Sequence, residues 1–111
     1  MNNRARCFVI QENNAANYSD AERYGDVVFM TVDEFKPNKG SLMNPRIIEQ
    51  IKQKLSDFTG DDFLILTGNP TIIGFAFAVA LDKLKPTEGL QVLQWDRMSS
   101  SYRPFTFDYK P

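Results

Sequence analysis

The chain has 111 residues, of which 42% are hydrophobic and 24% charged, and its formal net charge at pH 7 is −1. This balance is that of a globular protein long enough to bury a core, and it excludes extensive disorder and binding through a broadly basic surface. The lack of histidine removes the most common general base and most zinc sites, and the single cysteine, Cys7, excludes a disulfide within the chain.

The sequence also argues against a membrane or secreted protein. The longest nearly apolar stretch, residues 70–81, is shorter than the roughly 20 residues that a membrane-spanning helix needs. The N-terminal residues lead into a strand-length apolar run that contains Cys7 and lacks the character of a signal-peptide core. We therefore predict a cytoplasmic protein in which Cys7 is a small buried hydrophobic residue.

The N-terminal third is expected to hold two strands with a short helix between them. Residues 7–10 form a short apolar run, and residues 26–32 form a nearly continuous apolar run that is typical of a strand covered on both faces. Between them, Ser19 and Glu22 have the spacing of a capping box, which predicts a short helix that ends near Gly25.

Two longer helices are expected, and each follows an Asn-Pro pair. The first opens at Asn44-Pro45 and shows apolar residues at helical spacing until Gly60 ends it. The second covers residues 71–84, after a strand at residues 62–67, and is apolar on nearly every side. Such a helix needs burial on more than one side, by a sheet and by another element or subunit.

The C-terminal part predicts a hairpin of strands 90–95 and 102–109 around a polar loop. Because strands and helices alternate before it, the fold class is α/β: a small, mostly parallel open sheet of about five strands, with right-handed crossover helices and a C-terminal antiparallel β-hairpin. We expect residues 1–111 to form this one domain.

Gly68, Asn69 and Thr71 form a candidate ligand site at the turn between the third strand and the second long helix. Ligands bind beyond the carboxyl ends of strands in open parallel sheets, and a helix N-terminus attracts anions. However, phosphate-binding loops carry more glycines, and Pro70 removes one backbone donor. The stretch therefore predicts either a capped strand-to-helix turn or a nucleotide or anion site.

The hairpin carries a candidate partner-binding surface made of Trp95, Arg97, Tyr102 and Arg103. Tryptophan, tyrosine and arginine are the residues most enriched at binding hot spots. The same residues could stack nucleic-acid bases and hold phosphates, although the net charge makes nucleic acid the weaker hypothesis. The structural alternative is an ordinary edge hairpin in which Asp96 compensates an arginine.

No pattern of acidic residues indicates chemistry. The adjacent pairs Asp33-Glu34 and Asp61-Asp62 lack the spacing of metal-binding loops, and we interpret them as solvated turn carboxylates. No arrangement of Asp, Glu, Tyr or Ser has the form of a catalytic site. The sequence thus predicts no catalytic residue, no metal and no cofactor, and it favours a non-enzymatic protein.

Several stretches resemble small proteins encoded in the genomes of tailed phages. The matching residues are Tyr24-Gly25, residues 62–70, residues 73–76, and residues 93–97 with Tyr102 and Pro104. At position 69 this chain has asparagine where those proteins mostly have aspartate. The resemblance brings no assigned activity, and it implies a small accessory protein acting in the cytoplasm of the infected host cell.

Three functional hypotheses follow. The leading one is an interaction module that binds a protein partner, either a host or phage protein or a second copy of itself, through the apolar helix 71–84 or the terminal hairpin. The alternative is a small nucleotide-binding or anion-binding module at residues 68–71. Binding of single-stranded nucleic acid by the hairpin is the weaker alternative.

Overall fold

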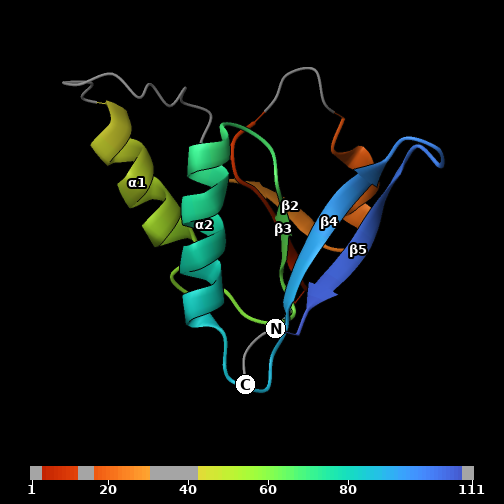
Figure 1. The fold of residues 1–111 in the computed structure, drawn as a ribbon. Helices are drawn as coiled ribbons and strands as arrows, with labels where there is room; N and C mark the ends of the chain where they lie inside the picture. Colours follow the sequence, from red (N-terminus) through yellow and green to blue (C-terminus); the bar gives the residue numbers. More distant parts are fainter. Residues whose placement is uncertain (1–3, 13–16, 31–42, 109–111) are drawn as a thin grey trace.

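The computed structural model describes residues 4–12, 17–30 and 43–108, which form a five-stranded sheet with helices packed against it (Figure 1). The strands are β1 (Arg6–Val9), β2 (Asp26–Phe29), β3 (Phe63–Ile65), β4 (Leu90–Asp96) and β5 (Ser101–Phe107). The helices are the short 3₁₀-helix η1 (Ser19–Arg23) and the α-helices α1 (Met43–Lys54) and α2 (Pro70–Lys83).

The strand order in the sheet is β2-β1-β3-β4-β5. All pairs are parallel except β4 and β5, which form an antiparallel hairpin. The predicted α/β class, with a mostly parallel sheet and a C-terminal antiparallel pair, is confirmed. Because the chain moves one way from β1 to β2 and the other way from β2 to β3, right-handed crossovers must use opposite faces of the sheet.

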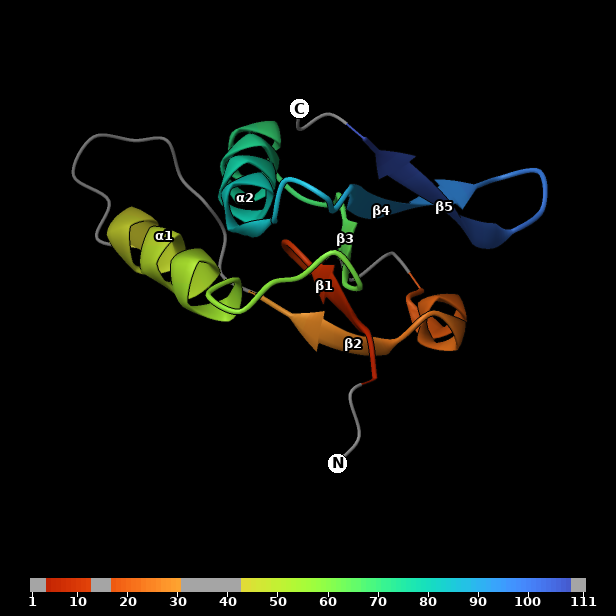
Figure 2. The same cartoon turned by 90° about the horizontal axis from the view of Figure 1, so that it is seen from below.

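The two faces accordingly carry two cores. The larger core lies under α1 and α2, and the smaller one lies under η1, on the other face (Figure 2). In β1 and directly after it, Phe8 and Ile10 face the larger core while Cys7 and Val9 face the smaller one, and all four are buried. This two-sided burial explains why the strand has no alternation of polar and apolar residues.

The second strand differs from the prediction. Residues 26–32 were expected to be covered on both faces, but in β2 Asp26 and Phe29 are exposed and Val27 and Val28 are half-buried. The reason is that β2 is an edge strand, a position that depends on the order of the strands and not on the residues of β2 alone. Residues 31–42, including Asp33 and Glu34, lie outside the described residues.

Helix starts were predicted with mixed success. Asn69 is the N-cap of α2 as expected, because its Oδ1 accepts from the Thr71 N–H at 2.8 Å. The predicted capping box at Ser19 is wrong, since Ser19 is already inside η1 and its N–H donates to Asn17 Oδ1. Helix α1 begins at Met43 and ends at Lys54, so the predicted cap at Asn44 and the predicted end at Gly60 are also wrong.

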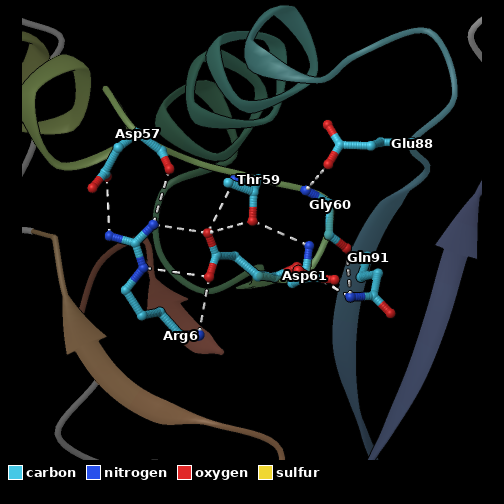
Figure 3. Close-up of polar contacts among 8 residues, drawn as sticks. Arg6, Asp57, Thr59, Gly60, Asp61, Glu88 and Gln91 are labelled. Atoms are coloured by element: carbon cyan, nitrogen blue, oxygen red, sulfur yellow. Dashed lines mark hydrogen bonds and ion pairs between the residues drawn. The ribbon is translucent and has the colours of Figure 1, made fainter. Parts of the chain in front are cut away.

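A polar network joins the amino ends of the central strands (Figure 3). The Asp62 carboxylate accepts from the Arg6 backbone N–H at 3.0 Å, from the Arg6 guanidinium at 2.9 Å and from the Thr59 N–H at 3.0 Å. With an exposed fraction of 3%, Asp62 is not the solvated turn carboxylate that we predicted, whereas Asp61 is exposed. Local sequence could not show this pairing because the two partners are 56 positions apart.

The network continues to β4. Gln91 donates from Nε2 to the Gly60 carbonyl at 2.9 Å, and the Glu88 carboxylate accepts from the backbone N–H groups of Lys85 and Gly60. Those backbone hydrogen bonds lower the pKa of Glu88, and the hydrogen bond to Asp62 raises the pKa of Arg6. The whole arrangement holds β1, β3 and β4 together at the edge opposite to the usual ligand side.

The pair of neighbouring aspartates supplies a matched test of this network. Replacing Asp62→Asn should lower the free energy of unfolding by about 2–4 kcal/mol, because it removes the buried carboxylate that pairs with Arg6 and accepts from the Arg6 and Thr59 N–H groups, and leaves Arg6 only the exposed Asp57 as a counter-ion. Asp61→Asn should change it by less than about 0.5 kcal/mol, as exposed substitutions usually do. Urea unfolding followed by circular dichroism measures both, and equal effects of the two changes would contradict the structural role of Asp62.

Cys7 gives a second test. Burial raises the pKa of its thiol to about 11, from an ordinary value of 9.0. At pH 8 the folded chain should therefore hold roughly a hundredth of the usual thiolate fraction. We expect a disulfide reagent to modify the native chain slowly and the urea-unfolded chain at once, which absorbance shows directly. The stabilisation from the neutral thiol is present below pH 9 and is lost as the pH rises towards 11.

Candidate functional site

The carboxyl edge of the sheet has its topological switch point between β1 and β3, which is where open α/β sheets usually bind ligands. Here the side chain of Gln11, directly after β1, occupies that place. Its Oε1 accepts from the Asn69 N–H at 2.7 Å, and its carbonyl accepts from Thr67 Oγ1 at 2.7 Å. With an exposed fraction of 7%, Gln11 closes the crevice between the two strand ends.

This arrangement accounts for the glycine in the predicted ligand site. Gly68 has φ +113°, and a Cβ built on it would lie 2.4 Å from Gln11 Oε1. The Asn69 N–H is bonded to Gln11, the Thr71 N–H is bonded to Asn69 Oδ1, and Pro70 has no N–H. The three predicted ligand residues do come together, but the N–H groups of Asn69 and Thr71 are used inside the chain.

Two glycines test this explanation. Gly68→Ala should lower the free energy of unfolding by about 2–4 kcal/mol, because it combines an unfavourable φ with a clash against Gln11. Gly74→Ala, in the middle of α2, meets nothing within 4 Å and should raise it by about 0.5–1 kcal/mol. Thermal and urea unfolding measure both; a Gly68→Ala protein as stable as the wild type would contradict the close approach of Gln11.

The carboxyl edge of the sheet also has a pocket, which lies beyond the end of β3. Strand β3 ends at Ile65, which pairs with Leu93, whereas β4 continues to Asp96. The hairpin therefore extends beyond β3 and diverges from α2 (Figure 1). A pocket of about 400 Å³, which we call the hairpin pocket, lies beside this step. It is lined by Ile65, Leu66, Thr67, Val92, Leu93, Gln94, Trp95, Tyr102, Phe105 and Phe107.

The hairpin pocket gathers most of the exposed large hydrophobic side chains. Six are found among the described residues, and four of them line it: Leu66, Trp95, Phe105 and Phe107. Phe105 and Phe107 contact each other with ring centroids 4.7 Å apart, and Phe77 of α2 meets Phe107 edge-on at 5.5 Å. The fifth, Met98, lies at the tip of the same hairpin, so only Phe29 lies elsewhere.

Helix α2 was expected to be buried on more than one side. Within the chain, only Ile72, Ala76 and Ala80 are buried, at a spacing of four residues, and the other large apolar side chains are half-buried. The sheet and α1 therefore bury the face of α2 that carries these three residues. The apolar side chains on either side of that face stay partly exposed. The Phe77 flank of α2 reaches β5 and borders the aromatic pair of the pocket.

The four predicted partner-binding residues do not form one cluster. Trp95 and Tyr102 face each other across the hairpin with ring centroids 5.1 Å apart. Arg103 lies on the opposite face of the hairpin, since side chains alternate along a strand, and its guanidinium is 3.6 Å from the Asp96 carboxylate. Arg97 lies in the exposed turn. The predicted compensation of Asp96 by an arginine is thus present.

Tyr102 has a structural task that sequence reasoning missed. Its exposed fraction is 3%, and its backbone is bonded to η1 on the outer edge of β5. The Tyr102 N–H donates to Asp20 Oδ2 at 2.7 Å, and its carbonyl accepts from Arg23 Nη2 and Tyr24 Oη, both at 2.9 Å. These contacts span about 80 positions and have no local signal in the sequence. They fix the direction in which the hairpin leaves the sheet.

The turn at the hairpin tip is held by the Asp96 carboxylate. Asp96 Oδ1 accepts from the Met98 N–H at 3.1 Å, and Asp96 Oδ2 accepts from Ser99 Oγ at 2.8 Å. The bond from Ser99, followed by the one from Met98, lowers the pKa of Asp96. The turn is closed by Ser100 in the left-handed region at φ 51°. Met98 is presented at the tip with an exposed fraction of 98%.

Comparison with protein families identifies the family to which the chain belongs. A family model described as "Phage Pam3 gp32-like protein" matches residues 5–109. The chain belongs to this family. The match spans η1, α2 and the whole hairpin, and it supports the phage-encoded accessory protein that the sequence resemblance implied. The family description names no activity. Comparison with curated proteins gave no match, and comparison with solved structures gave none.

Within residues 4–12, 17–30 and 43–108, no group of three or more His, Cys, Asp or Glu side chains is placed to hold a metal ion. In the same part of the chain, neither α1 nor α2 has the length and apolar character needed to cross a bilayer.

Proposed function

We propose that this phage accessory protein is an interaction module that binds a protein partner through the hairpin pocket and the adjoining flank of α2. The observation that carries the proposal is the convergence of Leu66, Trp95, Phe105 and Phe107, all exposed, on one pocket. Covering such side chains contributes about 25 cal/mol for each Å² of apolar surface removed from water. Clustered exposed apolar residues on a folded protein mark an interaction surface.

The surroundings of the pocket resemble the centre and rim of a protein interface. Aromatic residues form the centre, and the charged residues Arg97 and Arg103, with Asp96, lie around it on the hairpin. The hairpin is tied to η1 through Tyr102, close to the turn, and the turn itself is held by Asp96. A partner therefore binds a surface that is already ordered, which reduces the entropy lost on association.

Side-chain docking is favoured over the addition of a strand to β5. The outward main-chain groups of Tyr102 are already bonded to η1. Two residues further, Pro104 points its backbone nitrogen in the same outward direction and has no N–H to donate. An edge blunted in this way resists pairing with another strand. The partner should therefore contact the face of the hairpin and not this outer edge.

Adjacent residues of β5 supply the test. Phe105 and Thr106 are both exposed and point to opposite faces of the hairpin, and only Phe105 lines the pocket. In affinity capture from cells infected with the encoding phage, Phe105→Ser should reduce recovery of the specific partner at least tenfold, which corresponds to about 1.4 kcal/mol. Thr106→Ser should leave recovery unchanged. A partner retained equally by the two variants would exclude the hairpin pocket.

Binding of a nucleotide or anion at Gly68, Asn69 and Thr71 is the alternative proposal, supported by their place at the N-terminus of α2. A ligand at 100 times its dissociation constant would stabilise the fold by about 2.7 kcal/mol, so a thermal-shift series with nucleotides and inorganic phosphate tests it. Single-stranded nucleic acid is the weaker alternative, because Trp95 and Arg103 lie on opposite faces of the hairpin.

A further inference from the structure

We propose that the hairpin pocket binds an extended segment of a host or phage protein, which pairs its main chain with the inner edge of β4 at Trp95. The inner edge is the side of β4 that faces β3, and it is distinct from the blunted outer edge of β5. In this arrangement the Trp95 N–H donates to a carbonyl of the segment, and the Trp95 carbonyl accepts from an N–H of the segment. The inference rests on the proposed function, because it specifies the partner of the same pocket.

The main-chain groups of Trp95 point to the inner edge. Trp95 lies opposite Tyr102 in the antiparallel hairpin. The N–H and carbonyl of Tyr102 are bonded to η1, so they are not exchanged with Trp95. Opposite residues that do not exchange hydrogen bonds direct these groups away from each other. The N–H and carbonyl of Trp95 therefore point away from β5, towards the side on which β3 lies.

Strand β3 does not reach Trp95. It ends at Ile65, opposite Leu93, and three residues of β4, about 10 Å, extend beyond that level. The chain then turns towards β1, since the Thr67 carbonyl accepts from the Gln11 N–H at 3.2 Å. Within residues 4–12, 17–30 and 43–108, no group forms a hydrogen bond with the N–H or carbonyl of Trp95. An unpaired edge of this kind is a template for another strand.

The walls of the pocket come from both faces of the hairpin. Val92 and Phe105 belong to the face under α2. Leu93 and Tyr102 belong to the face under η1, and all four residues line the pocket. Because residues 65–67 line it as well, the pocket lies beside the inner edge that separates these faces. An extended segment fits this position, because its side chains alternate between the two faces.

The charges at this end of the hairpin favour an acidic segment. Arg97 is exposed in the turn and forms no ion pair within the described part of the chain. The Asp96 carboxylate already accepts from Ser99 and lies 3.6 Å from the Arg103 guanidinium. Two arginines against one aspartate leave a positive charge beside the pocket. An acidic residue next to the apolar residues of the segment would complement it.

Selection from a library of random linear peptides supplies the probe. The peptides to keep are those that bind the immobilised wild-type chain but not the Phe105→Ser variant, so that they occupy the hairpin pocket. Circular dichroism checks that the variant is folded. We expect the selected peptides to carry apolar residues together with an acidic one. A library from which no linear peptide is selected in this way would overturn the proposal.

Amide hydrogen exchange, followed by NMR, tests the main-chain contact with a selected peptide. The Thr106 amide is the matched control, because it lies opposite Gln91 and points to the outer edge of β5. In the free protein the amides of Trp95 and Thr106 should both exchange fast. Saturating peptide should slow the Trp95 amide at least tenfold and leave Thr106 unchanged. Protection of Thr106 in place of Trp95, or of neither, would overturn the pairing at β4.

The peptide itself gives an independent readout. Its backbone nitrogens are methylated one at a time, which removes an N–H and keeps every side chain. Methylation at one position should weaken binding at least tenfold, because that N–H no longer donates to the Trp95 carbonyl. A peptide that tolerates methylation at every position would contradict main-chain pairing.

Two arginines test the charge. Arg97→Gln should weaken binding of the acidic peptide at least threefold. Arg46→Gln removes the same charge from an exposed position of α1 and should leave binding unchanged. Equal binding by the two variants would contradict a contact between the acidic residue and Arg97.

The outcomes separate this inference from the proposed function. If no peptide protects Trp95 but a partner from infected cells is still lost on Phe105→Ser, the hairpin pocket remains a protein-binding site and the strand pairing is wrong. If Phe105→Ser changes nothing either, both proposals fail.

Discussion

The hydrogen bonds between the Tyr102 backbone and η1 are the constraint on which the rest of the structure depends. Each is worth about 0.5–1.5 kcal/mol net, and more where Asp20 or Arg23 carries a charge. They join a short helix near the start of the chain to its last strand and so fix how far the hairpin diverges from α2. The hairpin pocket exists because this angle is held and because β3 stops three residues before β4.

The same fold offers two places at its carboxyl edge, and they are used differently. The switch point between β1 and β3 is closed by Gln11, which satisfies the Asn69 N–H that an anion would otherwise bind. The second place is the hairpin pocket, which lies between the end of β3 and the hairpin and has mainly apolar and aromatic walls. An α/β sheet of this kind can therefore lose its usual ligand crevice and present a side-chain surface suited to a protein instead.

Sequence reasoning succeeded where the controlling interactions are local. The order of strands and helices, the Asn69 cap and the closing hairpin depend on residues within a few positions of each other. It failed where partners are distant along the chain. Asp62 is buried by Arg6, and β2 lies at an edge because of the strand order. At Ser19 the sequence has the spacing of a capping box, but Ser19 is the first residue of η1 and does not cap it.

The sequence by itself determined the α/β class, the apolar character of β1, β3 and α2, and the residues that could form an interaction surface. Only the tertiary structure decided which of them do so. Trp95 lines the pocket and Tyr102 is tied to η1, whereas Arg103 lies on the other face of the hairpin. Phe105 and Phe107 share that face with Arg103, and they also line the pocket. The physical reason is that a strand sets the face of each side chain, whereas contacts across about 80 positions decide which face is covered.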